Sequence, residues 1–420
     1  MKILILHRVP YPRIEYARGI DHHRHDVTYF GKREILATLP AGLPCRAIER
    51  PGTNSAFEEA RDWLQADPQS FDRVISLSEY ELLDAAQLRE WLGVPGASLE
   101  QVRLVRDKIV MKQAVQGAAL RVPRFLPLVD FVAAGGHAPW QKATVLKPHS
   151  GASSADVLVF ESPSHVFKAV AMQSTGIARL DADIPDIAAY EVEEFVSGPI
   201  LHFDGLIENG CILVLTASEY VGTCLGYANG RPLGSFHRPL TDQTRHWVQR
   251  ALNAVQIHNG SFHLEAIESG GELVFLEVGN RVGGADVVAT FERATGVHMP
   301  SQELRILLGE PTDIPSAALA GGRHWHGWFV YPGHHLGVGA YRGLDGADAF
   351  RGDPGVVSWA ELAAGTPLRS NVTYSAYEAP LAGIVATLSP RATREWLENL
   401  FESVSIQMDE AENLTLRSAA

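Results

Sequence analysis

The sequence predicts a protein of several lobes that combines the α/β and α+β fold classes. Its 420 residues are more than one hydrophobic core usually organises, so we expect two to four lobes. In the first hundred residues, short apolar runs alternate with helical patterns, which favours an open parallel sheet covered by helices. Later segments pair apolar runs across tight-turn residues, which favours antiparallel hairpins.

Composition and charge exclude several classes of protein. The formal net charge of -13 argues against broad binding to nucleic acid or to anionic membranes, both of which need clustered Lys and Arg. Cys45, Cys211 and Cys224 lie far apart without a C-x-x-C pair, which suits a reducing compartment. The apolar run Ile3–Leu6 is too short for a signal peptide, and no apolar stretch reaches membrane-spanning length. We expect a cytoplasmic protein.

The N-terminal region carries the alternating pattern. We expect parallel strands at "KILIL", "DVTYF" and "DRVISL", and helices at "SAFEEARDWLQA" and "EYELLDAAQLREWLG". A dinucleotide-binding lobe would carry G-x-G-x-x-G after its first strand. The residues that follow Leu6 lack those glycines, so a nicotinamide or flavin enzyme is disfavoured.

A second lobe is expected after a connecting helix. The stretch "SLEQVRLVRDKIVMKQAVQGA" predicts one continuous helix with Ser98 as its N-cap and Gly117 at its end. "KATVLKPHSGASSADVLVF" then predicts strand, Gly/Ser loop and strand. A helix at "PSHVFKAVAMQS" and a strand at "AAYEVEEFV" complete this smaller lobe.

The remaining chain predicts two hairpins and a tail. The first hairpin turns at Asn209-Gly210, and the second turns at Gly270-Gly271. Between them, "TDQTRHWVQRALNAVQIH" predicts an amphipathic helix capped by Thr241 or Asp242. From about residue 310 onward we expect aromatic and His-rich strands and a late helix at "SPRATREWLENLFES".

Two carboxylates in the second hairpin suggest a metal site. Glu265 and Glu277 lie on neighbouring predicted strands, and pairing about Gly270-Gly271 can place both on one face. Carboxylates held together need a cation, and Mg²⁺ takes oxygen ligands while keeping positions for phosphate and water. The alternative is that both are ordinary solvent-facing strand charges.

The Gly/Ser loop and a strand end supply two further elements. Lys147 ends an apolar strand, and the residues from His149 to Ser154 are small or polar, so that their backbone N–H groups can approach an anion closely. The stretch is not the G-x-x-x-x-G-K-[ST] phosphate loop, and a plain flexible turn is the alternative. At "YEVEEFVSG", the carbonyl of Glu194 and the N–H of Val196 can pair with a purine between apolar side chains.

The 17 histidines raise the possibility of zinc. "DHHRH" and "HWHGWFVYPGHH" have neither nearby Cys nor a helical H-E-x-x-H, which favours surface or packing roles for their histidines. Serine hydrolase chemistry has no G-x-S-x-G support. His237, in the expected loop "GSFHRP" between the hairpins, is a better candidate for touching substrate, with a structural role equally open.

Taken in order, these elements resemble the ATP-grasp superfamily over roughly residues 1 to 310. The resemblance rests on the helix with Asp107-Lys108, the Lys147 strand with its loop, "EEFV", and two Glu before Arg281. "EVGNRVGG" and the aromatic-rich C-terminal region look most like the carboxylate-amine ligases of the L-amino-acid ligase group, which form dipeptides. The resemblance implies an ATP-grasp fold with an N-terminal Rossmann-like lobe.

The resemblance also implies four lobes. These are an N-terminal α/β lobe (1–115), a small lid lobe (116–195), a large lobe with the metal site (196–310) and a C-terminal subdomain packed on the large lobe (311–420).

Nucleotide contacts are carried over residue by residue. Lys108 and Lys147 would contact the ATP phosphates, with Ser153 and Ser154 in the covering loop. The remaining nucleotide contacts would be Glu193, Glu194, Phe195 and Val196 at the adenine and His202 and Asp204 at the ribose. The family often holds the ribose with an acid farther from the hinge, so the last two residues are a departure from its pattern.

Metal and substrate contacts follow in the same way. Mg²⁺, with Mn²⁺ as a substitute, would be held by Glu265, Glu277 and Asn280. The family often has Asn two residues after the second Glu, where this chain has Gly279. Lys147 and Arg281 would be catalytic, with Arg281 steadying the carboxylate and its acyl phosphate. His237, Gly283 and Gly284 would line the substrate site.

The implied activity is an ATP-dependent ligation. The chain would join a small-molecule carboxylate to an amine, both of them amino acids, through an acyl phosphate with release of ADP and phosphate. A carboxylase-like ligase, a carboxylate–thiol ligase and a non-catalytic nucleotide-binding protein remain alternatives. We expect no nucleic-acid or membrane partner, and a homodimer stays open.

Overall fold

The computed structural model describes residues 1–151, 153–315, 324–337 and 340–408, and divides into two compact units. The first unit comprises Met1–Ala217, Leu240–Gly283 and Thr295–Gly321. The second comprises Ser218–Pro239, Gly284–Ala294 and Gly322–Ala420. The four-lobe division stays a prediction from sequence.

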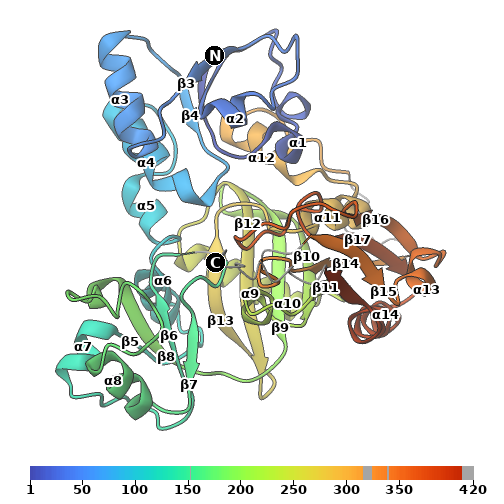
Figure 1. The fold of residues 1–420 in the computed structure, drawn as a ribbon. Helices are drawn as coiled ribbons and strands as arrows, with labels where there is room; N and C mark the ends of the chain where they lie inside the picture. Colours follow the sequence, from blue (N-terminus) through green and yellow to red (C-terminus); the bar gives the residue numbers. More distant parts are fainter. Residues whose placement is uncertain (152, 316–323, 338–339, 409–420) are drawn as a thin grey trace, which may run out of the picture. The chain divides into compact units, whose positions relative to one another are not determined.

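The first unit begins with the expected parallel sheet, drawn in blue in Figure 1. Its strands are β1 (Lys2–His7), β2 (Asp26–Gly31), β3 (Arg46–Glu49) and β4 (Arg73–Ile75), in the order β3-β2-β1-β4. Alternate residues of β1 enter different cores, because successive strand side chains point to opposite faces. Ile3 and Ile5 join one core, and Leu4 and Leu6 join the other.

Helices cover both faces of this sheet. α3 (Ala56–Ala66) and α4 (Leu82–Leu92) pack on the side of Leu4. α12 (Met299–Leu308) packs on the side of Ile3. The short elements α1 (Tyr11–Ile14), η1 (Tyr16–Arg18), α2 (Arg33–Leu36) and η2 (Glu79–Glu81) complete the region.

The connecting segment is two helices, so the prediction of one continuous helix was wrong. α5 (Leu99–Arg103) ends before Asp107, and α6 (Lys108–Gly117) begins just after it. Asp107 is the N-cap of α6, because its carboxylate accepts hydrogen bonds from the backbone N–H groups of Ile109 and Val110. An N-cap residue has non-helical backbone angles, so the helix is interrupted at Asp107 although the apolar periodicity of the sequence continues across this position.

The small antiparallel sheet follows, with strands β5 (Phe125–Pro127), β6 (Thr144–Pro148), β7 (Leu158–Phe160) and β8 (Tyr190–Glu194) in the order β5-β8-β6-β7. α7 (Leu128–Ala133), α8 (Pro163–Ala171) and η3 (Ile187–Ala189) belong to the same region. The strand–loop–strand and helix predicted here are confirmed.

A larger antiparallel sheet completes the first unit. β9 (Ile200–Glu208), β10 (Cys211–Val221), β12 (Gly260–Ser269) and β13 (Glu272–Gly279) lie in the order β13-β12-β9-β10, with β10 ending in the second unit. α6 and α10 (Asp242–Ala254) pack on one face through a core that includes Met111, Leu252 and Phe262. Both predicted hairpins are confirmed, and Thr241 caps α10.

The second unit contains β11 (Leu233–Arg238), β14 (Trp325–Tyr331), β17 (Leu381–Thr387) and β16 (Val356–Glu361) in that order, and the pair β15 (Tyr341–Asp345) and β18 (Ser405–Met408). Its helices are α9 (Cys224–Ala228), α11 (Val287–Thr295), α13 (Asp348–Arg351) and the predicted late helix α14 (Pro390–Ser403). His237 lies inside β11, so its placement in a loop was wrong. β11 pairs with β14, which draws the segment before Pro239 into the sheet.

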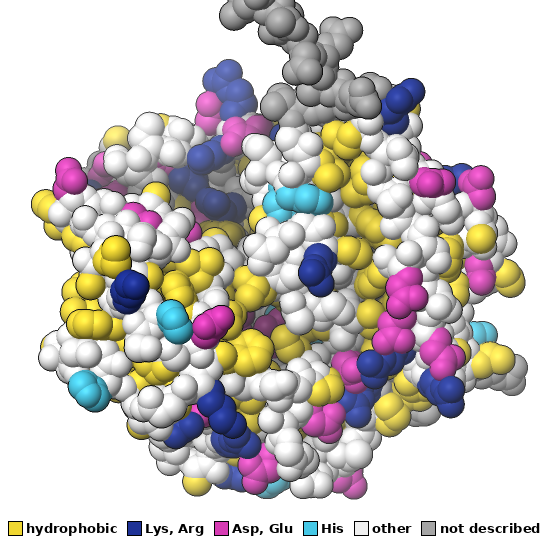
Figure 2. All heavy atoms as spheres, turned by 60° about the horizontal axis from the view of Figure 1, so that its bottom comes forward, with side chains coloured by type: hydrophobic (Ala, Val, Ile, Leu, Met, Phe, Trp, Pro, Cys, Tyr) yellow, Lys and Arg dark blue, Asp and Glu magenta, His cyan; other side chains and the backbone are white. Residues whose placement is uncertain are grey.

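The described helices include none with the length and apolar character needed to cross a membrane. On the face in Figure 2, Lys and Arg side chains stand beside Asp and Glu, interspersed with apolar and neutral surface. The expectation of no nucleic-acid partner stays a prediction.

Candidate functional site

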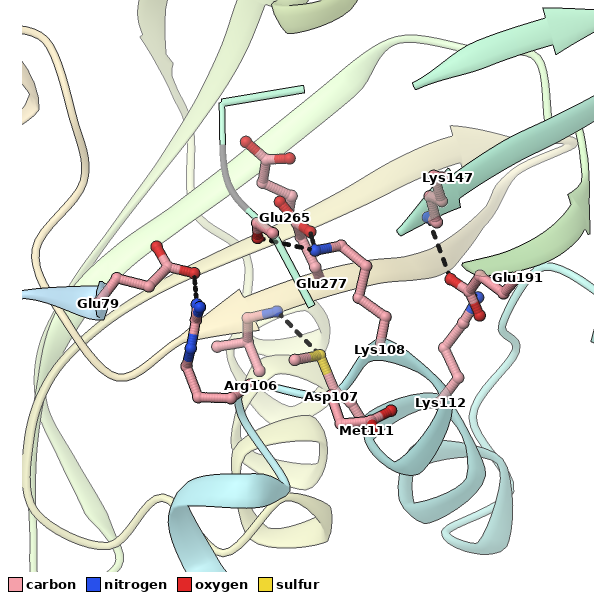
Figure 3. Close-up of polar contacts among 12 residues, drawn as sticks. Glu79, Arg106, Asp107, Lys108, Met111, Lys112, Lys147, Glu191, Glu265 and Glu277 are labelled. Atoms are coloured by element: carbon pink, nitrogen blue, oxygen red, sulfur yellow. Dashed lines mark hydrogen bonds and ion pairs between the residues drawn. The ribbon is translucent and has the colours of Figure 1, made fainter. Parts of the chain in front are cut away.

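The two carboxylates predicted to share a face do so. In the antiparallel pairing of β12 with β13, Glu265 lies directly opposite Glu277. The preceding pair, Leu264 and Val278, points into the core, so the two carboxylates lie on the other face. Figure 3 shows the two side chains beside each other. Glu265 is buried, whereas the Glu277 side chain is 39% exposed.

Lys108 reaches this pair from the first turn of α6. Its Nζ lies 3.0 Å from Glu277 Oε2 and donates to the Gly151 carbonyl oxygen at 3.2 Å. Burial alone would raise the pKa of Glu277, but the ammonium groups of Lys108 and Lys147 lower it to about 2. The carboxylate is therefore ionised at neutral pH and available as an oxygen donor.

The Gly/Ser loop is tied to the start of α6. The Lys108 backbone N–H donates to the His149 carbonyl at 2.8 Å, and His149 Nδ1 lies 3.2 Å from an Asp107 carboxylate oxygen. Ser153 and Ser154 have φ angles of 59° and 54°, a left-handed conformation that is uncommon outside glycine.

Lys147 belongs to a buried ionic cluster that the sequence did not reveal. Lys147 Nζ lies 2.6 Å from Glu193 Oε1, and Lys112 Nζ lies 2.6 Å from Glu193 Oε2 and 2.8 Å from Glu191 Oε1. Burial opposes ionisation of Lys147, but the two glutamates raise its pKa. The Glu193 carboxylate, expected at the adenine, is thus engaged by two lysines. Glu191 and Glu193, two residues apart on β8, were the available signal.

The expected adenine contact lies just beyond β8. The Glu194 carboxylate accepts from Arg124 Nε at 2.7 Å, and the Phe195 N–H donates to the Ala143 carbonyl at 2.9 Å. Within the described ranges, the Val196 N–H has no hydrogen-bond partner. The Phe195 side chain is 48% exposed. A planar ligand could therefore meet both a donor and an aromatic side chain here.

A row of histidines and carboxylates runs along the polar face of β9 and β12. Asp204 Oδ2 lies 2.6 Å from His202 Nδ1, and Asp204 Oδ1 lies 2.7 Å from His263 Nδ1. His263 Nε2 lies 3.3 Å from Glu265 Oε1. Burial opposes the charged form of each group, but the histidines hold the pKa of Asp204 well below its usual range. The carboxylates of Asp204 and Glu265 raise the pKa of His263 to about 10.

This row changes the expectation for the ribose. Both Asp204 oxygens already accept from imidazoles, and Asp204 and His202 are each 1% exposed. These two side chains are therefore buried and engaged with each other and with His263, which does not favour a contact of either with a ribose. In the part of the chain that the structure describes, His202, Asp204 and His263 form one group whose ligand atoms all lie within 4.8 Å of one another.

Asn280 and Arg281 follow β13 and have different partners. Asn280 Nδ2 donates to the Ser261 carbonyl at 2.7 Å. Arg281 Nε donates to Glu79 Oε2 at 2.5 Å, and Arg106 donates to the other oxygen of Glu79. Sequence reasoning missed Glu79. It follows the end of β4, and the carboxyl ends of parallel strands are a usual place for ligand contacts, which was the available signal.

The remaining predicted residues are divided between the units. Gly283 ends the first unit, and Gly284 and His237 belong to the second. A Cβ added at Gly284 would meet no heavy atom within 4 Å, so this glycine leaves open space. Some of the histidines considered for zinc have structural partners. His22 contacts Tyr29 Oη at 2.8 Å, and His334 contacts the Ala228 carbonyl at 3.0 Å.

Comparisons with known proteins confirm the fold that the sequence resemblance implied. No protein-family model matches the chain. A stretch of 246 residues is 26% identical to the L-arginine-specific L-amino acid ligase of Bacillus subtilis and covers 56% of this chain and 57% of that protein. The chain thus matches little more than half the length of that relative.

Solved structures match over nearly the whole chain. The L-amino acid ligase of Bacillus licheniformis has a TM-score of 0.69 at 19% identity, over 97% of this chain and 98% of that one. The biotin carboxylase domain of Hydrogenobacter thermophilus 2-oxoglutarate carboxylase, solved as a dimer with MgADP, ADP and bicarbonate, has a TM-score of 0.64 at 13% identity. That match covers 97% of this chain and 90% of that one. The chain has the ATP-grasp fold.

Proposed function

We propose that this chain is an ATP- and Mg²⁺-dependent ligase that joins the carboxylate of one amino acid to the amine of another. The observation that carries the proposal is the opposed pair Glu265 and Glu277 with Lys108 Nζ 3.0 Å from the second carboxylate. Three charged groups from two strands and a helix end converge on one point, next to the loop that starts after Lys147.

The residues at this point fit a magnesium ion. Two carboxylates face each other across adjacent strands, and Lys108 pairs with Glu277. Asn280 uses its Nδ2 toward Ser261, which turns its amide oxygen away from that contact. Carboxylate and amide oxygens suit Mg²⁺, with Mn²⁺ as a substitute. When bound, the ion supplies neutralising charge to the phosphate oxygens.

The reaction follows from what the side chains can stabilise. A carboxylate oxygen attacks the γ-phosphorus of ATP, ADP leaves, and an acyl phosphate forms. The amine nitrogen then attacks the carbonyl carbon and loses a proton, and the carbon–oxygen bond to phosphate breaks. Lys108 and Lys147 neutralise phosphate charge, and Arg281 holds the carboxylate and its acyl phosphate.

The nucleotide base fits the strand end after β8. The Val196 N–H would donate to the adenine, the carbonyl of Glu194 would accept from it, and Phe195 would cover the ring. Ser153 and Ser154 would close over the phosphates from the loop that Lys108 contacts through Gly151. The substrate contacts of His237, Gly283 and Gly284 remain sequence-based proposals.

Amino acids are proposed as substrates because the named relatives are L-amino acid ligases. The test is to incubate the chain with ATP, Mg²⁺ and pairs of amino acids, measuring ADP and phosphate. We expect amino-acid-dependent phosphate release and a product whose mass is the sum of two amino acids less water. Formation of AMP and pyrophosphate would contradict the proposal. A product formed only with bicarbonate or a thiol would favour the alternative ligases.

A further inference from the structure

Asp204 and His263 connect Glu265 to the interior of the sheet. His263 Nδ1 lies 2.7 Å from Asp204 Oδ1, and His263 Nε2 lies 3.3 Å from Glu265 Oε1. On the other side of Asp204, His202 Nδ1 lies 2.6 Å from Oδ2. One imidazole thus stands between two carboxylates, and one of these carboxylates faces Glu277.

The strand register fixes this arrangement. In the antiparallel pairing of β9 with β12, Asp204 lies opposite His263 and His202 lies opposite Glu265. Alternate strand positions share a face, so all four side chains come to one side of the sheet. Asp204 is 1% exposed and His263 is 8% exposed. Hydrogen bonds between buried charged groups are strong and resist competition from water.

We propose that Asp204 and His263 are positioning residues that orient the Glu265 carboxylate for the metal site opposite Glu277. This inference rests on the proposed function. The His263 ring contacts Asp204 through Nδ1 and Glu265 through Nε2, so Asp204 holds the ring in the orientation that brings Nε2 to Glu265 Oε1. The hydrogen bond to Oε1 fixes the rotation of the carboxylate and thereby the direction of its other oxygen. Partners behind a metal ligand commonly tune its orientation in this way.

The test measures metal binding directly. Mn²⁺ is titrated into the full chain with ADP present, and free Mn²⁺ is followed by electron paramagnetic resonance. We expect Asp204→Asn and His263→Gln to weaken Mn²⁺ binding about 10- to 100-fold. Ser261→Ala, a buried change two residues earlier on the same strand face, is the matched control and should leave binding unchanged. Circular dichroism and urea midpoints show whether each variant is folded.

A double-mutant cycle separates positioning from general destabilisation. If Asp204 acts through Glu265, adding Asp204→Asn to Glu265→Gln should weaken Mn²⁺ binding by less than two-fold. Independent effects would multiply instead. A full additional loss in the double variant, or wild-type affinity in both folded single variants, would overturn the inference.

Two further outcomes overturn it in favour of other roles. A ribose contact by Asp204 is tested by titrating ADP and 2′-deoxy-ADP into the wild-type chain and into Asp204→Asn. A change in the ratio of the two affinities in the variant would favour that role. Direct ligation of the metal by His202, Asp204 and His263 predicts a different result. In that case Mn²⁺ would still bind to the double variant Glu265→Gln/Glu277→Gln but would no longer bind to Asp204→Asn. If the wild-type chain binds neither ADP nor Mn²⁺, the proposed function itself fails.

Discussion

Arg281 Nε donates to Glu79 Oε2 at 2.5 Å, although 202 residues separate them in the chain. The same carboxylate accepts from Arg106 through its other oxygen, so Glu79 holds two guanidinium groups. The Glu79 side chain is 14% exposed, and those of Arg106 and Arg281 are 9% and 25% exposed, so both ion pairs are shielded from water. Glu79 thereby sets the direction in which Arg281 points.

Glu79→Gln should lower the catalytic efficiency with the carboxylate substrate. With one charge removed, Arg281 is no longer fixed, and we expect kcat/KM for the carboxylate substrate to fall about ten-fold, or ~1.4 kcal/mol. The KM for ATP should change little. Steady-state assays of ADP release check this, with Glu100→Gln as an exposed control near the start of α5. A defect confined to the ATP KM would contradict the assignment of Arg281.

Glu277→Gln should abolish turnover. The amide keeps the shape of the side chain but removes the charge that pairs with Lys108 at 3.0 Å and that we assign to the metal. We expect at least a 100-fold loss of ADP release, on the scale of removing one electrostatic contact to developing charge. Glu272→Gln is a matched control on the same strand, since its side chain is 68% exposed and pairs with Arg121 at the surface. Equal activity of the two variants would remove Glu277 from the site.

Local patterns were enough to predict the hairpin that carries the carboxylates. Glu265 and Glu277 flank Gly270-Gly271 in two runs of strand-forming residues, which predicts the hairpin. Their common face depends on a shift of register between Glu265 and Ala266, which brings Glu277 instead of Leu276 opposite Glu265 and which no local pattern predicts. The break between α5 and α6 was missed because Asp107 interrupts an apolar periodicity that continues on both sides of it. Its capping role is visible only in the hydrogen bonds it accepts.

Contacts between distant segments could not be predicted. Glu79 meets Arg281 only because the parallel sheet and β13 come together within the first unit. His263 meets Asp204 because of the register between β9 and β12, which are separated by more than fifty residues of chain. The alternation of apolar and polar residues predicts which face of a sheet a side chain lies on. It does not predict which residue of a distant strand lies opposite.

Lys112→Met should destabilise the chain although Lys112 lies outside the proposed nucleotide contacts. Its ammonium group is fully buried between Glu191 and Glu193, and its loss leaves Lys147 as the cation for both. We expect the free energy of unfolding to fall by about 3–5 kcal/mol, measured by urea denaturation. Lys112→Met combined with Glu191→Met should recover part of this loss.

The surface pair Arg121–Glu272 supplies the control for the buried cluster. Both side chains are largely exposed, so Arg121→Met should cost less than about 1 kcal/mol. Equal losses for Lys112→Met and Arg121→Met would show that the buried cluster contributes no more than a surface ion pair.

Glu303 should make stability depend on pH. The side chain is 4% exposed on α12, and burial raises its pKa to about 7 against an ordinary value of 4.5. Between these values the folded chain binds a proton that the unfolded chain has lost, so stability falls as pH rises through this range. Glu303→Gln mimics the protonated form and removes this dependence. Its advantage over wild type should grow by roughly 2 kcal/mol between pH 5 and pH 8. Urea denaturation at both pH values measures the difference, and an advantage that is constant or shrinks with pH would contradict the raised pKa.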